Sequence, residues 1–172
     1  MELPARKHIR LKEYNYAAGG AYFVTICTQG RVCLFSLPVG AAPCGRPDLT
    51  RSIAEKWMEK IPEKYPGVRV EKFVVMPNHI HALLLFDNMP TAGGHMGPPL
   101  PRIVDWYKTM TTNEYIRLVK VGKLMPFQKR VWQRGYYEHI IRDENDLLIH
   151  WQYIEHNPAC WADDPYYGEE LQ

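Results

Sequence analysis

One stretch limits the folds open to this chain: two apolar segments rich in β-branched residues flank the pair Pro77-Asn78. Proline pre-sets a turn dihedral and asparagine tolerates the left-handed region, so the stretch predicts a strand over 68–76, a tight turn and a strand over 79–86. Because side chains alternate along a strand, His79 and His81 leave the same face. Two imidazoles together beside a turn favour half of a divalent-metal site. Two solvated histidines, or two satisfied within the core, are the alternative that this spacing leaves open.

The other elements follow from composition and periodicity. β-branched and aromatic residues predict a strand over 21–27. Apolar residues spaced four apart predict a helix over about 50–65, and a second helix runs from Pro101-Arg102 to about 121. Its buried face is predicted from the apolar residues Ile103, Tyr107, Met110, Ile116 and Val119. Alternation of side chains predicts a strand over 131–142.

A last helix is predicted over 143–157. Asp143 is a good N-cap, and acidic residues in the first turn favour the positive end of the helix dipole. We expect this helix to end at Asn157-Pro158, because the residue before a proline is pushed out of the helical region.

The resulting order is strand, helix, hairpin, helix, strand, helix. It predicts an α+β fold, an antiparallel sheet with helices packed mainly on one side, in a ferredoxin-like or RNA-recognition-like arrangement. We expect a single domain over 1–172, with Gly/Pro-rich loop insertions at 37–48 and 88–101 and an acidic tail at 160–172.

The composition excludes a membrane protein, since no apolar run approaches the ~20 residues of a membrane span. The four cysteines, at positions 27, 33, 44 and 160, match no Cys-x-x-Cys zinc pattern. We therefore expect reduced thiols, a cytoplasmic protein and no membrane partner.

The formal net charge of +2 conceals an uneven distribution. Residues 102–142 carry nine Lys or Arg against three Asp or Glu, whereas residues 143–172 carry eight Asp or Glu and no Lys or Arg. Basic charge interleaved with aromatic residues suits a nucleic-acid strand, through phosphate contacts and base stacking. A solvated helix face over core aromatics is the alternative. The candidate DNA-binding residues are Lys108, Lys129, Arg130, Arg134 and Arg142.

The last predicted helix has two faces. Leu147, Trp151 and Ile154 form an apolar stripe for docking, while a polar stripe of Asp146, His150, Tyr153 and Asn157 lies on a different side. A tyrosine can act as a covalent nucleophile, and an amide oxygen one turn away can be a third metal ligand. Mixed nitrogen and oxygen ligands with open positions suit Mg²⁺ or Mn²⁺ bound together with a phosphate. Taken alone, Tyr153 also fits a partly buried packing residue.

Three motifs occur in order: Met76-Pro77-Asn78-His79-Ile80-His81, Trp132-Gln133-Arg134-Gly135-Tyr136-Tyr137-Glu138-His139-Ile140-Ile141-Arg142, and Tyr153-Ile154-Glu155-His156-Asn157-Pro158. With these motifs the chain resembles the single-tyrosine HUH transposases, in particular the REP-associated tyrosine transposase branch, over about residues 8–160. The resemblance implies that His79 and His81 are metal ligands, that Tyr153 is the nucleophile and that Asn157 is the third ligand.

The same resemblance implies an enzyme that cleaves and rejoins single-stranded, hairpin-bearing DNA through a 5′-phosphotyrosine, without a nucleotide cofactor. It also implies a monomer or a homodimer, in which the last helix serves its own chain or the partner chain. One alternative is a DNA-hairpin-binding protein that keeps the fold without transposing. Another, an RNA-binding domain of the recognition-motif type, does not account for the two histidines and the tyrosine together. The Gly/Pro-rich loops and the short acidic tail depart from the family pattern and leave the DNA target open.

Overall fold

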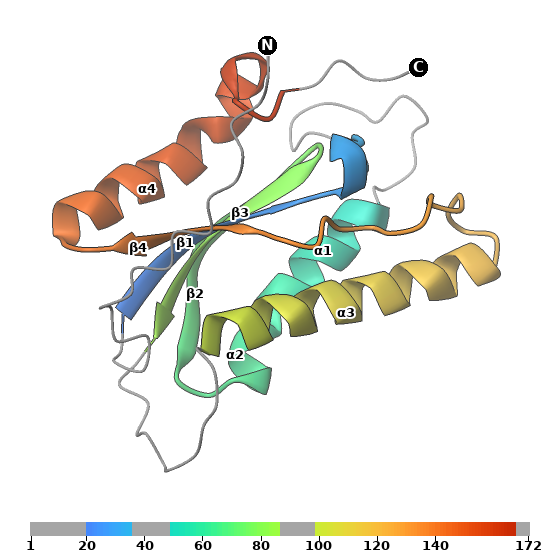
Figure 1. Cartoon of the computed structure of the whole chain (residues 1–172), viewed down its shortest axis with the longest axis horizontal. Coiled ribbons are helices and arrows are strands. Elements are labelled where there is room, and N and C mark those ends of the chain that lie inside the picture. The colour runs from blue at the N-terminus through green and yellow to red at the C-terminus, as the bar shows by residue number, and fades with distance from the viewer. Residues whose placement is uncertain (1–19, 36–48, 87–98, 168–172) are drawn as a thin grey trace.

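The computed structural model describes residues 20–35, 49–86 and 99–167, and folds them into one antiparallel sheet with helices on both faces (Figure 1). The strands are β1 (Gly20–Cys27), β2 (Val68–Met76), β3 (His79–Phe86) and β4 (Tyr137–Ile141). The helices are α1 (Leu49–Glu59), α2 (Ile61–Lys64), α3 (Pro99–Lys120) and α4 (Glu144–His156), with short 3-10 helices η1 (Gln29–Arg31) and η2 (Asn157–Asp163). The α+β prediction is confirmed.

The strands lie in the order β2-β3-β1-β4, so β1 and β3 are inner strands and β2 and β4 are the edges. β2 and β3 form the predicted hairpin over the predicted residues, with Met76 paired to His79 across a two-residue turn. β1 then pairs with β3 on one side and β4 on the other, in antiparallel register. A helix follows β1 and another follows β3, which gives the predicted ferredoxin-like arrangement.

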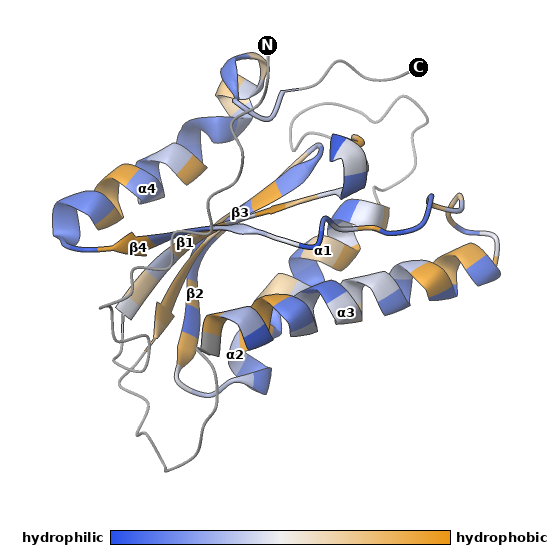
Figure 2. Ribbon diagram, viewed as in Figure 1, coloured by the Kyte–Doolittle hydropathy of each residue, from blue (hydrophilic) through white to orange (hydrophobic). Residues whose placement is uncertain are grey.

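The helices divide between the two faces of the sheet. α1 and α3 cover one face and α4 lies alone on the other, as Figure 1 shows with α4 above the strands and the other helices below. The prediction of helices mainly on one side holds for α1 and α3. Figure 2 shows hydrophobic residues on the strands and a mixture of hydrophobic and hydrophilic residues along the helices.

The alternation of side chains gives each face its own hydrophobic cluster. The cluster beneath α1 and α3 is large and takes Tyr22, Val24 and Ile26 from β1. The cluster beneath α4 is small and consists of Phe23, Val74, Met76, Leu83 and Ile154. The α4 face therefore has room for buried polar side chains.

The predicted helix over 50–65 is two helices. α1 ends at Glu59 and α2 begins at Ile61, with Pro62 inside the first turn of α2. A proline lacks the N–H that an uninterrupted helix needs and its ring clashes with the carbonyl four residues earlier. The break therefore follows from the proline.

The buried face of α3 differs from the prediction in its second half. Ile103 and Tyr107 are buried as predicted, but Ile116 is 37% exposed and Tyr115 is buried in its place. The Tyr115 hydroxyl donates to the backbone carbonyl of Thr50, which satisfies its polar atom inside the core. A prediction from hydrophobicity alone chooses Ile116 instead of Tyr115 for the buried face, because a buried tyrosine whose hydroxyl has a hydrogen-bond partner packs as well as isoleucine.

The predicted strand over 131–142 is shorter than expected. β4 covers Tyr137–Ile141, and nearer the start of the range Trp132 makes an isolated bridge with Thr28. Between them, Lys108 donates from Nζ to three successive carbonyls, at 2.9, 3.2 and 3.0 Å, those of Gln133, Arg134 and Gly135. Three carbonyls that converge on one ammonium cannot alternate as a strand requires.

The ends of α4 agree only in part with the prediction. Asp143 caps the helix as predicted, since its side chain accepts from the Asp146 N–H. α4 also ends at His156, as predicted, but Asn157 keeps helical dihedrals (φ −54°, ψ −43°), so the expected reason, that Asn157 leaves the helical region, is wrong. Pro158 has no N–H to continue the α-helical pattern, and the chain tightens into η2 instead.

The apolar stripe predicted on α4 docks through fewer residues than expected. Ile154 is fully buried and Leu147 packs against the small cluster, whereas Trp151 is 37% exposed. The polar stripe faces the sheet as well, because the small cluster leaves space for it. The predicted loop at 37–48, residues 88–98 of the second loop and the last five residues of the tail lie outside the described residues, while residues 99–101 belong to α3.

Candidate active site

The β2–β3 hairpin positions two histidines on the α4 face of the sheet. His79 and His81 are 0% and 1% exposed, and their Nε2 atoms lie 2.9 Å apart. The turn that precedes them is fixed on both sides, because the Pro77 carbonyl accepts from the Phe35 N–H and the Asn78 carbonyl accepts from the Thr28 N–H. The two imidazoles predicted to share a face are therefore brought into contact.

Each imidazole is oriented by a neighbour at its other nitrogen. His79 Nδ1 lies 2.8 Å from Asn78 Oδ1, and His81 Nδ1 lies 2.8 Å from the Thr25 hydroxyl on the paired position of β1. The Asn78 amide nitrogen donates to the carbonyls of Arg31 and Tyr166, so its oxygen is the atom that faces His79. His79 Nδ1 must then carry the proton, which leaves the Nε2 lone pair directed at the shared space.

Both histidines are neutral in this environment. Burial, followed by the proximity of His81, lowers the pKa of His79 to about 3. Burial likewise lowers the pKa of His81. A neutral imidazole is the form that binds a metal, so burial prepares both side chains as ligands.

α4 brings Tyr153 over this pair. Its ring lies 5.1 Å from the His81 ring and 5.9 Å from the Phe23 ring, both edge to face. The side chain is 37% exposed, so the phenol is accessible while its ring is packed. Burial and the charge of Asp164 raise the pKa of Tyr153 to about 12, which keeps the phenol protonated near neutral pH.

Asn157 lies one turn further along the same face. Its Nδ2 donates to Asp164 Oδ2 at 2.9 Å. Its Oδ1 is buried and has no hydrogen-bond partner among the residues that the structure describes. An orphaned buried oxygen costs free energy, and a bound cation is one way to satisfy it.

Asp164, which follows η2, meets all of these groups. Its Oδ2 lies 3.8 Å from His79 Nε2 and 4.0 Å from His81 Nε2, and the Tyr153 hydroxyl donates to it at 3.4 Å. Burial raises the pKa of this carboxyl, but the neighbouring His81, the Tyr166 N–H and Asn157 outweigh it and lower the pKa of Asp164 to about 2. The carboxylate is thus charged and sits at the centre of the site.

These donor atoms fit a divalent cation. One ligand atom each from His79, His81 and Asp164 lies within 4.8 Å of the others, and all three residues are buried. Two neutral imidazoles with oxygen donors suit Mg²⁺, Mn²⁺ or a later transition metal. The buried Asn157 Oδ1 is a further unsatisfied oxygen, on the residue whose Nδ2 contacts Asp164.

Sequence reasoning misses several members of this site. It places Asp164 in an acidic tail and interprets Asn78 as a turn residue only. Thr25 and Phe23 lie on the α4 face of β1, and the Tyr166 ring packs at a tilt against His79, with the centroids 4.8 Å apart. Phe23 and Thr25 could have been found from the alternation of side chains in β1, which places them on one face, opposite to Tyr22, Val24 and Ile26. No periodicity links Asp164 to the site, because it follows a 3-10 helix.

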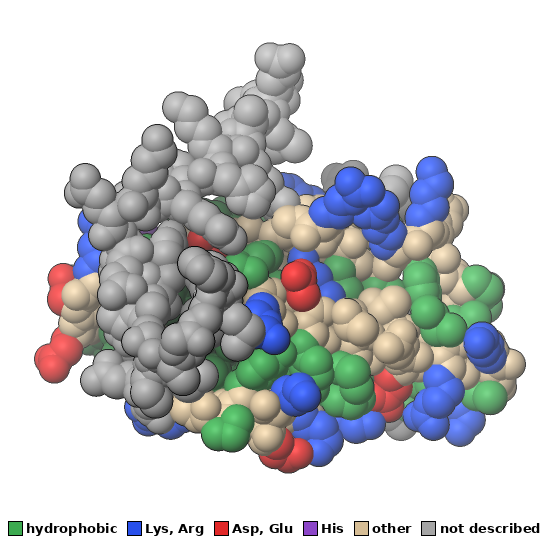
Figure 3. All heavy atoms as spheres, turned by 60° about the horizontal axis from the view of Figure 1, so that its bottom comes forward, with side chains coloured by type: hydrophobic (Ala, Val, Ile, Leu, Met, Phe, Trp, Pro, Cys, Tyr) green, Lys and Arg blue, Asp and Glu red, His purple; other side chains and the backbone are tan. Residues whose placement is uncertain are grey.

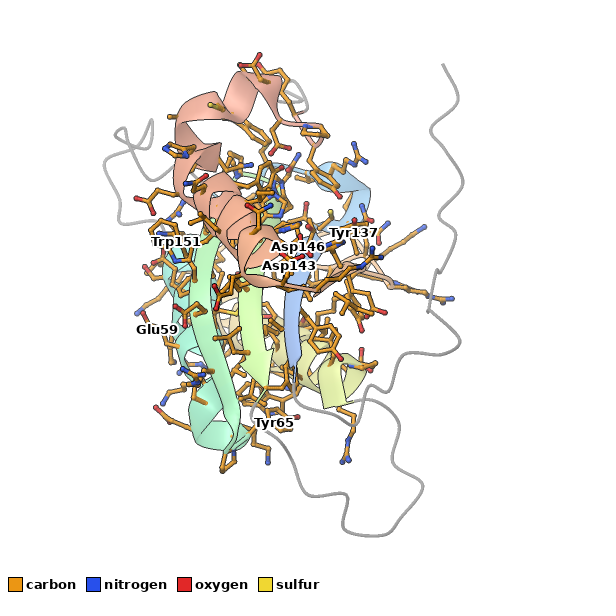
Figure 4. The ribbon with its side chains drawn as sticks, turned by 90° about the vertical axis from the view of Figure 1, so that its left-hand side faces the viewer. Glu59, Tyr65, Tyr137, Asp143, Asp146 and Trp151 are labelled. Carbon is orange, nitrogen blue, oxygen red and sulfur yellow. The ribbon has the colours of Figure 1, made fainter. Side chains whose placement is uncertain are left out.

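A second polar cluster ties the start of α4 to β4. His139 Nε2 lies 2.9 Å and His150 Nδ1 3.1 Å from the Asp146 carboxylate, which also accepts the Arg142 N–H. Figure 4 shows Asp146 at the start of α4 close to β4, and Trp151 on the opposite side of the helix. His150 Nδ1 also lies 2.8 Å from the Asp146 carbonyl, so this nitrogen carries a proton rather than a lone pair for a metal.

The five cations predicted to contact DNA do not form one group. Lys129, Arg130 and Arg134 are exposed on the coil that follows α3, whereas Arg142 is exposed at the junction of β4 and α4, on the other side of the molecule (Figure 1). The ammonium of Lys108 is held by three carbonyls. Figure 3 shows Lys and Arg side chains spread over the right-hand end, where α3 ends and the coil begins.

Comparisons with known proteins find relatives of this chain. A Haemophilus influenzae protein named "Uncharacterized protein" is 36% identical over 171 residues, 94% of this chain and 93% of that protein. A second H. influenzae protein, named "Putative REP-associated tyrosine transposase", is 27% identical over 84% of this chain and 73% of its own length. One of these two relatives is thus named as a transposase, and this chain is similar to it in sequence over most of its length.

A solved structure of a REP-associated tyrosine transposase bound to a REP hairpin superposes with a TM-score of 0.49 at 20% identity, and covers 92% of this chain and 73% of that one. No protein-family model matches the chain. Among the described residues, no helix is both long enough and apolar enough to cross a membrane.

Proposed function

We propose that this protein cleaves and rejoins single-stranded, hairpin-bearing DNA with Tyr153 as the nucleophile. The observation that supports this most is the convergence of Tyr153, His79, His81, Asn157 and Asp164 within one chain. A packing tyrosine would not need two neutral imidazoles, a buried amide and a carboxylate around its hydroxyl. Of the two expected states, a monomer would build this site within one chain, and a homodimer that exchanges α4 would build the same site from two chains.

In the proposed reaction the Tyr153 oxygen forms a bond to the scissile phosphorus and the bond from phosphorus to the 3′ oxygen breaks. The phenol loses its proton, and the leaving 3′ oxygen gains one to become a hydroxyl. Because the pKa of Tyr153 is raised to about 12, the phenol needs activation at neutral pH. A second 3′-hydroxyl can reverse the step, since the phosphotyrosine keeps the energy of the phosphodiester.

A divalent cation, Mg²⁺ or Mn²⁺, would be held by His79 and His81 with a third oxygen ligand, a position that the resemblance assigns to Asn157, and would supply charge stabilisation at the phosphate. Asn78 and Thr25 hold the two imidazoles with their Nε2 atoms inward. Phe23 packs against His81 at 5.2 Å and against Tyr153, which fixes the ring of the nucleophile relative to the ligands. Such support from outside the ligand set is typical of sites that demand precise geometry.

The test is a covalent adduct. Wild-type protein incubated with Mn²⁺ and a hairpin-bearing oligonucleotide should give a protein–DNA band that survives denaturing electrophoresis. Tyr153→Phe should abolish the band, because only the nucleophilic oxygen is removed, and hairpin binding should remain. Tyr137→Phe is the matched control, as Tyr137 is also exposed but lies on β4.

An adduct that persists in Tyr153→Phe would refute the assignment. Wild-type protein that binds the hairpin but never forms an adduct would instead favour the alternative, a hairpin-binding protein that keeps the transposase fold.

DNA binding should depend on salt through the exposed cations of the coil. The slope of log affinity against log salt for single strands changes by about 0.7 for each phosphate that is no longer neutralised. The double variant Arg130→Ala, Arg134→Ala should therefore flatten this slope by about 1.4. The slope is obtained by measuring the affinity for the oligonucleotide at several salt concentrations. Lys108→Ala is not a suitable control, since it would leave three carbonyls without their donor. Lys60→Ala is a suitable control, because Lys60 lies between α1 and α2. An unchanged slope in the double variant would place the phosphate contacts elsewhere.

A further inference from the structure

Asp164 holds a position that packing alone does not explain. A single carboxylate oxygen, Oδ2, approaches both imidazole Nε2 atoms, accepts from the Asn157 amide and accepts from the Tyr153 hydroxyl. The side chain is 0% exposed. Burying a carboxylate is expensive unless it is paired. Among the described residues, the Asp164 carboxylate faces the two imidazoles, at 3.8 and 4.0 Å. A divalent cation between these groups would compensate the buried carboxylate.

The distances between the donors fit one cation. When each ligand atom is ~2.1 Å from an ion, two of them lie ~3–4 Å apart. The separation of the two imidazole nitrogens is 2.9 Å, and Oδ2 lies 3.8 and 4.0 Å from them. The three atoms thus have the spacing of neighbouring ligands around a shared centre.

Asn157 is less suited to the ligand role than Asp164. Its Nδ2 already donates to the carboxylate, which directs the amide towards Asp164. A charged carboxylate is also a stronger ligand for a hard divalent cation than a neutral amide oxygen. The amide can hold the carboxylate in place through Nδ2, while its Oδ1 is buried without a hydrogen-bond partner among the described residues.

The backbone around Asp164 is anchored to the histidine hairpin by an independent contact. Asp164 Oδ1 accepts the Tyr166 N–H at 2.6 Å, and the Tyr166 carbonyl accepts from Asn78 Nδ2 at 2.8 Å. Asn78 is the same residue that orients His79 through Oδ1. One asparagine therefore aligns an imidazole and the segment that carries the carboxylate.

We propose that Asp164 is the third protein ligand of the cation, together with His79 and His81, and that Asn157 is a positioning residue that holds this carboxylate. The inference deepens the proposed function, because it concerns the cation on which that function rests. A site of two histidines and one carboxylate leaves coordination positions open for a phosphate.

The experiment measures cation binding by DNA-free protein. Mn²⁺ is titrated into chelator-treated wild type and variants, and free Mn²⁺ is followed by its electron paramagnetic resonance signal. Asp164→Ala should weaken Mn²⁺ binding by at least tenfold, and Asp164→Asn should recover part of that loss, since the amide keeps an oxygen. Asp163→Ala is the matched control: this neighbouring carboxylate is exposed and should leave the affinity unchanged.

Asn157→Ala separates the two possible ligands. If Asp164 is the ligand, Asn157→Ala should lose less affinity than Asp164→Ala. A larger loss in Asn157→Ala, or Mn²⁺ binding by Asp164→Ala that equals the wild type, would overturn the proposal. Circular dichroism and the melting temperature without metal verify that each variant is folded, and Asp164→Asn provides a second test if Asp164→Ala is not.

The two proposals fail in different ways. A Tyr153 adduct together with Mn²⁺ binding that ignores Asp164 would leave the DNA-cleaving function standing and remove this ligand. Mn²⁺ binding that depends on Asp164, without any adduct, would keep Asp164 as a ligand and refute the DNA-cleaving function.

Discussion

The two faces of the sheet use the same strands for different purposes. In the described part of the chain, the face under α1 and α3 buries 22 residues in one hydrophobic cluster, whereas the cluster under α4 has five. The α4 face instead buries His79, His81, Asn157 and Asp164. Alternate residues of β3 therefore supply either the core or the site, and a shift of one residue in register would exchange them.

The contrast shows where stability and chemistry are separated. Buried apolar area is the main stabilising contribution to a fold, and the larger cluster supplies most of it. The α4 face gives up such area for polar groups that must be oriented by partners, as Thr25 and Asn78 orient the imidazoles. The stability of this protein should consequently depend on one face, and its acid sensitivity and cation binding on the other.

The largest effect should come from adjacent leucines of β3 that point to opposite faces. Leu84 belongs to the large cluster and Leu83 to the small one, and both are at most 1% exposed. Leu84→Ala should lower the free energy of unfolding by about 3–5 kcal/mol, and Leu83→Ala by about 2–3 kcal/mol, because a single helix can settle into the cavity it leaves. Urea denaturation measures both. Equal losses would mean that α4 is held as rigidly as the other helices.

An intermediate effect is expected from acid. The buried His79 has its pKa at about 3, whereas the unfolded imidazole titrates near 6.5. As the pH falls from 7 to 5 the unfolded chain gains a proton that the folded chain does not, so chelator-treated protein should lose about 2 kcal/mol of stability through this residue. His79→Gln should remove that share of the loss. The control variant, His156→Gln, changes an exposed histidine at the end of α4 and should show the same loss of stability as the wild type.

The smallest effect should come from the outer side of α4. The Lys72 ammonium lies 3.4 Å from the centroid of the Trp151 ring, and Lys72 also pairs with Glu155. These contacts tether the helix to the edge strand β2 but are partly exposed. Trp151→Ala should cost about 0.5–1 kcal/mol in a denaturant titration and leave Mn²⁺ affinity unchanged. A loss of cation binding in this variant would show that the site depends on the tether.

The sequence predicts the sheet, the hairpin and the two histidines because alternation and turn chemistry are local properties. β2, β3 and the cap of α4 lie where expected for that reason. The roles of Tyr153 and Asn157 come from a resemblance and stay predictions until the adduct and cation experiments are done. What the sequence cannot predict depends on contacts between distant segments.

Two residues illustrate that limit. Lys108 is predicted to meet DNA from its charge, yet it binds carbonyls 25 to 27 residues away. Asp164 counts in the sequence as one charge of an acidic tail, although its position next to the histidines gives it a distinct chemistry. The sequence gives the sign of each charged side chain but not the groups that it contacts in the fold, and those contacts decide its function.

The helical backbone that runs from α4 through Asn157 has a mechanical consequence. Asn157 keeps helical dihedrals, so Tyr153 and Asn157 share one rigid element, whereas Asp164 lies beyond a kink at Cys160 (φ −107°, ψ 24°). Asp164 is also tied to the histidine hairpin, because its Oδ1 accepts the Tyr166 N–H and the Tyr166 carbonyl accepts from Asn78. A rotation of α4 about Arg142 and Asp143 would therefore withdraw the phenol and the amide together and leave the carboxylate with the imidazoles.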